Sequence, residues 1–244
     1  DYPVAFWGAL RAGIIPIPVN PLLTAEQYAY LFADSRAAAV VVSGAMLPTL
    51  LSIRERLHFR AIVVVGPGPE HAAALREREV LAFEDVLALG KPHPFVAPTL
   101  SDEVAFWMYT SGSTGDPKAV KHVHTSLMAT ARLMGQGVIG IRADDVMFSA
   151  SKLPFSYGLG NTMSFPMSVG ASAVLMYDRP TAQSVLTTLR AHRPTIFCAV
   201  PSLYAMLLAH PEIGPGAGSD RLRLCISAGE ALPAHLGERW QAVV

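Results

Sequence analysis

Short, fully apolar runs that alternate with helix-like segments set the strongest constraint on the fold of this 244-residue chain. Two such runs, 38–42 (AAVVV) and 61–65 (AIVVV), contain no polar residue. Uninterrupted runs of this kind are typical of parallel strands, because helices cover both faces of a parallel sheet. We therefore predict an α/β fold built from parallel βαβ units with right-handed crossovers.

The same patterns predict the other elements. Thr24 and Gln27 form a capping-box pair at the start of a helix that should run to about Ser35. Further helices are predicted at 3–12, 43–57, 125–134, 182–191 and 202–209. Further strands are predicted at 14–19, 104–109, 146–150, 173–177, 196–200 and 222–227.

The segment 66–98 is rich in proline and glycine and surrounds one short helical stretch. Such composition is typical of a weakly organised connection, so we place a boundary near Pro98. The predicted organisation is a first α/β subdomain at 1–98, followed at 99–244 by the phosphate-loop segment and a second α/β subdomain, with both subdomains incomplete.

Composition excludes several classes of protein. Hydrophobic residues make up 51% of the chain and charged residues 16%, which favours a globular core over disorder. The 19 basic and 19 acidic residues balance, and no Lys or Arg cluster is present, so no nucleic-acid partner is expected. The uncharged stretch Leu153–Tyr177 is interrupted by prolines and glycines, so we interpret it as a buried loop and strand, not a membrane span.

Residues Tyr109 to Lys118 read YTSGSTGDPK, with four hydroxyl side chains and two glycines at the six positions from Thr110 to Gly115. Glycines permit the positive φ angles that turn successive N–H groups toward one anion, and Lys118 can add a positive charge. The segment therefore predicts a phosphate-binding loop. A flexible connector is the alternative, but the apolar run before the loop and the Pro-Lys after it disfavour one. The loop lacks the Walker A pattern, because Asp116 follows Gly115.

This loop matches the form [YF]-T-S-G-[ST]-T-G-x-P-K, so the chain resembles the AMP-forming acyl-CoA synthetases, adenylation domains and luciferases. Further segments resemble the benzoate-CoA ligase group within that family. They are KLPFSYGLGN at 152–161, FPMSVGASAVLM at 165–176, PTIFCAVPSLY at 194–204 and CISAGEAL at 225–232. The resemblance covers essentially the whole chain.

The resemblance implies the roles of particular residues. It gives Lys118 and Thr114 as catalytic residues of the phosphate loop. It implies that the nucleotide contacts Thr110, Ser111, Gly112, Ser113, Thr114, Gly115, Lys118, Gly229, Glu230 and Ala231. It implies that the acid substrate contacts Ser151, Ser156, Tyr157, Gly158 and Ala228. We assign no metal-ligating side chain, and ATP, Mg²⁺ and coenzyme A are the implied cofactors.

Two of these assignments have structural alternatives. Tyr157 would offer a flat wall to an aromatic acid, or it is an ordinary buried aromatic residue. At the positions of Ser151 and Ser156, the benzoate-CoA ligase group is expected to have small apolar residues. The two serine hydroxyls would instead suit an acid with a polar substituent on its ring. Apart from the resemblance, Gly229 and Glu230 read equally well as a strand-to-helix turn with a surface glutamate.

The implied reaction needs no nucleophilic side chain, because the carboxylate of the substrate attacks the α-phosphorus of ATP. The chain contains no G-x-S-x-G, H-E-x-x-H or paired-cysteine motif, in agreement with this chemistry. Lys121 and Lys152 are interpreted as solvated lysines or as a source of positive potential near the phosphates. His122 and His124 are given no role, and Cys198 and Cys225 are expected to be inert thiols of a cytoplasmic protein.

The chain resembles an internal fragment of the large N-terminal domain, without the small C-terminal lid domain of the family. We therefore expect little or no turnover from it alone. Two other functions stay open: an adenylation domain that charges a carrier-protein thiol, and a catalytically dead nucleotide-binding module. The sequence also leaves open whether the longer protein is a homodimer.

Overall fold

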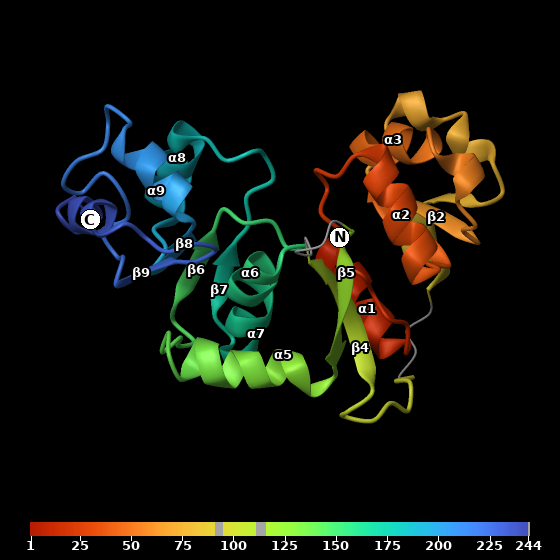
Figure 1. Cartoon of the computed structure of the whole chain (residues 1–244), viewed down its shortest axis with the longest axis horizontal. Helices are drawn as coiled ribbons and strands as arrows, with labels where there is room; N and C mark the ends of the chain where they lie inside the picture. Colours follow the sequence, from red (N-terminus) through yellow and green to blue (C-terminus); the bar gives the residue numbers. More distant parts are fainter. Residues whose placement is uncertain (91–94, 111–115, 244) are drawn as a thin grey trace. The chain divides into compact units, whose positions relative to one another are not determined.

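The computed structural model describes residues 1–90, 95–110 and 116–243 (Figure 1). These residues form two compact units. The first unit comprises Asp1–Thr99 with Tyr109–Val120, and the second comprises Leu100–Met108 with Lys121–Val244. The strands β4 (Val104–Thr110) and β5 (Lys118–Val123) form a two-stranded sheet that contributes residues to both units.

The first unit is built around a small parallel sheet. Its strands are β1 (Ala39–Ser43), β2 (Ala61–Val65) and β3 (Val80–Ala82), in the order β1-β2-β3. In the register, Ala39 faces Ala61 and Ile62 faces Val80. The helices of this unit are α1 (Tyr2–Arg11), α2 (Ala25–Ser35), α3 (Leu47–Leu51) and α4 (Phe83–Leu89).

Helix α2 begins where the sequence predicts. The Gln27 amide donates to Thr24 Oγ1 at 3.3 Å, and the Thr24 amide donates to Gln27 Oε1 at 2.9 Å, which completes the capping box. Tyr28 and Ala29 are buried on one side of the helix, within the core that also contains Ile62 and Val64 of β2. Helix α2 is thereby fixed to the sheet of the first unit.

The second unit contains a four-stranded parallel sheet in the order β7-β6-β8-β9. Its strands are β6 (Val146–Ser149), β7 (Ser172–Val174), β8 (Ile196–Ala199) and β9 (Leu224–Ser227). Its helices are α5 (Thr125–Thr130), α6 (Ser156–Leu159), α7 (Phe165–Val169), α8 (Ala182–His192), α9 (Pro201–Leu208) and α10 (Ala234–Gln241). π-helical turns at Ala131–Gln136 and Gly160–Ser164 extend α5 and join α6 to α7.

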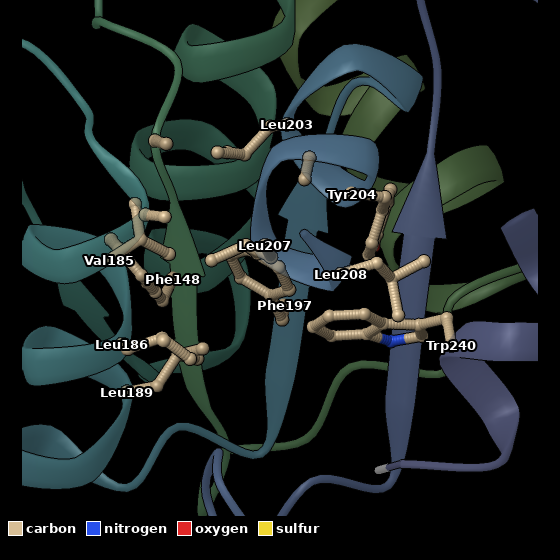
Figure 2. Packing of buried hydrophobic residues seen from close by; sticks show 13 residues of the cluster. Phe148, Val185, Leu186, Leu189, Phe197, Leu203, Tyr204, Leu207, Leu208 and Trp240 are labelled. Carbon is tan, nitrogen blue, oxygen red and sulfur yellow. The ribbon is translucent and has the colours of Figure 1, made fainter. Parts of the chain in front are cut away.

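Alternate residues of this sheet enter two separate cores, as the pleat of a strand requires. On one face, Phe148 and Phe197 pack with Leu186 of α8, Leu207 of α9 and Trp240 of α10 (Figure 2). On the other face, Met147, Ile196 and Cys198 pack with Ala131 and Phe165 from the helical segments 125–136 and 156–169. The predicted α/β fold with parallel sheets is therefore confirmed, with helices on both faces.

Several predicted elements are wrong or incomplete. Residues 14–19 form no strand, because Pro16 and Pro18 lack the N–H groups that a ladder needs. The predicted helix at 43–57 is broken into α3 and short 3₁₀ turns. The interpretation of Leu153–Tyr177 as loop and strand misses a helical run at 156–169. The short strands β3 and β5 are absent from the predicted set.

No helix among the described residues is both long enough and apolar enough to cross a bilayer.

Candidate functional site

The predicted phosphate loop is described only at its ends. Thr110 is the last residue of β4 and Lys118 is the first residue of β5, and both side chains are exposed. Five predicted contacts, Ser111, Gly112, Ser113, Thr114 and Gly115, lie outside the described residues. The phosphate-binding role of the loop therefore stays a prediction.

The predicted acid and nucleotide residues of the second unit follow the carboxyl ends of β6 and β9, and β8 lies between these two strands. Ser151 comes shortly after β6, Val200 follows β8, and Ala228 follows β9. The Ala228 amide lies 3.4 Å from the carbonyl oxygen of Ala199, which extends the pairing of β8 and β9 by one residue. Ligands commonly bind at this edge of a parallel sheet, because loops meet there above the strand ends. We call this region the carboxyl edge.

Tyr157 connects helix α6 to the carboxyl edge. Its hydroxyl lies 3.1 Å from the carbonyl oxygen of Ile226 and 3.3 Å from that of Ala199, so it donates a shared hydrogen bond to β8 and β9. Burial raises the pKa of Tyr157, so the phenol stays a neutral donor. The side chain has a structural function whether or not it also contacts an acid.

The Ile226 carbonyl also accepts a hydrogen bond of 2.9 Å from the hydroxyl of Tyr204, a residue of α9. Tyr157 packs with the core on one face of the sheet, and Tyr204 belongs to the core on the other face. The half-buried phenol of Tyr157 and the buried phenol of Tyr204 thus hold the end of β9 from both sides. Sequence analysis gives no role to Tyr204, because its partner lies 22 residues away on another element.

Position 158 requires glycine, because the surrounding backbone leaves no room for a side chain. A Cβ atom at this position would lie 2.2 Å from the carbonyl oxygen of Lys152 and 2.8 Å from that of Ser151. Helix α6 therefore packs directly on the backbone that leaves β6. This close approach places Ser151, Ser156 and Tyr157 in one compact segment, although the predicted contact of Gly158 with the acid stays untested.

One interpretation of Lys152, a freely solvated lysine, is wrong. Its ammonium group donates to the carbonyl oxygens of Met176 at 2.5 Å, Tyr177 at 2.6 Å and Asp178 at 2.6 Å. It is neither a freely solvated lysine nor an uncommitted positive charge, because three carbonyl dipoles surround it. The acceptors lie 24 to 26 residues along the chain, so no local pattern could identify them.

The predicted nucleotide turn follows β9. Gly229 has a φ of +95°, a conformation that side chains rarely adopt, so this position favours glycine. Glu230 and Ala231 are exposed, and Ala228 is half-buried. The turn is therefore open to a ligand on its surface, and the assignment of Gly229, Glu230 and Ala231 to the nucleotide stays a prediction.

A cavity of about 340 Å³ lies beside β9, and it is lined mainly by Leu222, Leu224, Cys225, Leu232 and Trp240. Its lining includes none of the residues predicted to bind the acid or the nucleotide. The predicted acid contacts therefore occupy a different part of the second unit.

His122, Cys198 and Cys225, to which the sequence analysis assigns no function, are packed against other parts of the protein. The His122 ring stacks on Phe106 with centroids 4.5 Å apart, and burial lowers the pKa of His122. Cys198 is buried and Cys225 is half-buried, and both are free thiols whose pKa is raised by burial. Over the ranges that the structure describes, His, Cys, Asp and Glu form no group of three or more with the arrangement of a metal site.

Comparison with known proteins gives a consistent result. The model of the family described as AMP-binding enzyme matches residues 1–244. The chain is 49% identical over 242 residues to the 4-hydroxybenzoate–CoA/benzoate–CoA ligase of Rhodopseudomonas palustris, which covers 99% of the chain and 43% of that protein. It is 46% identical over 244 residues to the benzoate–CoA ligase of Thauera aromatica, with 99% of the chain and 44% of that protein covered.

Solved structures agree with these relatives. A benzoate CoA ligase from Burkholderia xenovorans LB400 is 41% identical with a TM-score of 0.87, and the match covers 99% of this chain and 46% of that one. The anthranilate CoA ligase AuaEII in complex with anthranoyl-AMP is 34% identical with a TM-score of 0.89, and the match covers 98% and 45%. The chain thus spans less than half the length of these proteins.

Proposed function

Because this chain belongs to the AMP-binding enzyme family, we propose that the protein containing it activates a small aromatic carboxylic acid with ATP and transfers the acyl group to coenzyme A. The observation that carries the proposal is the carboxyl edge of the second unit. There the predicted acid residues of 151–158 follow β6, whereas Ala228 and the predicted nucleotide residues 229–231 follow β9, and only β8 lies between these two strands. An acid and an adenylate could therefore be held next to each other.

In the proposed reaction, a carboxylate oxygen of the acid attacks the α-phosphorus of ATP. The bond between the α-phosphorus and the bridging oxygen breaks, and pyrophosphate leaves. The thiol of coenzyme A then attacks the acyl carbon, loses its proton, and displaces AMP. The protein contributes by holding two anions in line and stabilising charge on the transferring group.

The residues of this chain have the chemistry for these tasks. Backbone amides, hydroxyl groups and the Lys118 ammonium would hold the phosphates, and Tyr157 with Ser151 and Ser156 would bind the acid. A Mg²⁺ that arrives with ATP would be bound mainly by phosphate oxygens and waters, which is usual for this cation in nucleotide sites. It would supply charge neutralisation at the phosphates.

The proposal is supported by the names of several relatives, which are ligases for benzoate and hydroxybenzoates. The hydroxyls of Ser151 and Ser156 would suit a ring that carries a polar substituent. We therefore propose benzoate or a hydroxybenzoate as the acid.

Carboxylate-dependent exchange of pyrophosphate into ATP tests the proposal on the longer protein and on this chain alone. We expect exchange with benzoate or 4-hydroxybenzoate by the longer protein, and little or no exchange by the 244-residue chain. Absence of exchange with any aromatic acid by the longer protein would contradict the proposed function. Full exchange by this chain alone would contradict only the expectation that further residues are required.

The contribution of the phosphate loop can be tested at Lys118. In the longer protein, Lys118→Ala is expected to lower kcat/KM for ATP in this exchange by about 10- to 100-fold, the cost of losing a hydrogen bond to a charged group. Lys121→Ala is the matched control, because residues three apart on a strand point to opposite faces of β5. Equal effects of the two substitutions would contradict the assignment of Lys118.

A further inference from the structure

Helix α2 is bonded to both ends of the predicted phosphate loop. The hydroxyl of Tyr109, at the start of the loop, donates to Asp34 Oδ2 at 2.5 Å. The hydroxyl of Tyr30 donates to the carbonyl oxygen of Pro117, near the end of the loop, at 3.3 Å. All four residues belong to the first unit.

The two helix residues lie on one face of α2. Tyr30 and Asp34 are four residues apart, and residues at this spacing are neighbours on a helix surface. The opposite side of the helix is anchored, because Tyr28 and Ala29 are buried in the core of the first unit. The loop ends are therefore bonded to a rigid element and not to another loop.

The charges around these groups agree with this arrangement. Partial burial, together with the carboxylates of Asp34 and Asp116, raises the pKa of Tyr30. Burial and the hydrogen bond to Asp34 raise the pKa of Tyr109. Both phenols are consequently neutral donors at ordinary pH, and Asp116 lies close enough to Tyr30 to influence it.

We propose that Tyr30 and Asp34 are positioning residues that hold the two ends of the phosphate loop at a fixed separation before ATP binds. The proposal rests on the proposed function, since it assumes that the loop binds the triphosphate. Neither residue has to touch the nucleotide. Fixing both ends during folding lowers the conformational entropy that ATP binding would otherwise have to remove.

Amide hydrogen exchange tests the positioning role without any catalysis. In this chain, Asp34→Ala and Tyr30→Phe are each expected to increase the exchange rate of segment 109–118 by about threefold to tenfold, the value of one hydrogen bond. The double variant should exchange faster than either single variant. Asp34→Asn should restore the wild-type exchange rate, because its amide oxygen can still accept from Tyr109 without carrying charge.

Two substitutions on the same helix serve as controls. Tyr28→Phe removes a hydroxyl that donates to the Asn20 carbonyl, and Glu26→Gln removes a carboxylate that pairs with Arg56. Neither bond involves the loop, so both variants should exchange like the wild type in segment 109–118. Unchanged exchange in Asp34→Ala and Tyr30→Phe, or an equal increase in the controls, would overturn the proposal.

The consequence for the reaction is measured separately in the longer protein. Asp34→Ala and Tyr30→Phe are each expected to raise KM for ATP by about threefold to tenfold in pyrophosphate exchange, with little change in kcat or in KM for the acid. Faster amide exchange with an unchanged KM for ATP would overturn the positioning role. A wild-type protein without pyrophosphate exchange would instead contradict the proposed function, and the amide-exchange result would still stand for the two hydrogen bonds.

Discussion

Replacing Asp145 with alanine is expected to lower the free energy of unfolding of the second unit by about 3 kcal/mol, the lower end of the cost of breaking a buried ion pair. The Asp145 side chain is only 2% exposed, and its oxygens accept hydrogen bonds from three groups. These are the Arg223 guanidinium at 2.5 and 2.9 Å, the Thr195 hydroxyl at 2.7 Å and the Arg142 amide at 2.8 Å. We expect the lower end because the Arg223 side chain is 29% exposed and would regain water.

The Asp145 cluster ties together segments that start separate strands. Asp145 and Thr195 precede β6 and β8, and Arg223 precedes β9. The cluster therefore lies at the amino ends of the strands, opposite the carboxyl edge. Because of this position, we expect Asp145→Ala to act on stability and not on a ligand contact.

The contribution of Asp145 should depend on pH. Burial alone would raise the pKa of this carboxyl, but hydrogen bonds from Arg223 and Thr195 outweigh burial and hold the pKa at about 2. The unfolded chain has the ordinary pKa near 3.9 and therefore binds more protons as the pH falls. The wild type should therefore exceed Asp145→Asn in free energy of unfolding by about 1 kcal/mol less at pH 3 than at pH 6.

Urea denaturation followed by circular dichroism at both pH values measures these differences. Asp220→Ala is the control, because Asp220 forms an exposed ion pair with Arg193 at 2.5 Å. Exposed pairs contribute little, so its denaturation midpoint should stay close to that of the wild type. A wild-type midpoint for Asp145→Ala would show that the cluster does not stabilise the sheet.

Replacing Gly158 with alanine is expected to cost about 3 kcal/mol, the upper end of the range for overpacking. The new Cβ would lie 2.2 Å from the Lys152 carbonyl oxygen, so the backbone of α6 or of 151–152 has to move. This movement would also displace Tyr157 from the carbonyls of Ala199 and Ile226. In the longer protein, we therefore expect KM for the acid to rise more than KM for ATP.

Gly237→Ala is the matched control for this substitution. Gly237 lies inside α10, and a Cβ there would meet only Leu232 at 3.5 Å, an ordinary van der Waals contact. Alanine is the better helix former, so this variant should be unchanged or slightly stabilised. Denaturation curves measure the free energy of unfolding of both variants. If Gly158→Ala is as stable as the wild type, the backbone around residue 158 relaxes without cost and the prediction is wrong.

Most of the regular elements could be predicted because their signals are local. The apolar run of β1, the apolar run of β2 and the capping box of α2 are each contained within three to five consecutive residues. The short strand β5 has no strand pattern in the sequence, because the adjacent polar residues Lys121 and His122 break the alternation of polar and apolar positions. The helical run 156–169 has no helix pattern in the sequence, because its glycines and proline disfavour a helix, and only burial against the sheet overrides that preference.

The α/β class, the order of most helices and strands, and the family resemblance carried by 109–118 and the later motifs can be predicted from the amino-acid sequence. The three carbonyls around Lys152 and the attachment of three strand starts to Asp145 become visible only in the folded chain. The same is true of the hydrogen bonds between α2 and both ends of the predicted loop. Local patterns reflect backbone preference, whereas each of these contacts joins groups that are distant along the chain and meet only when the elements pack together.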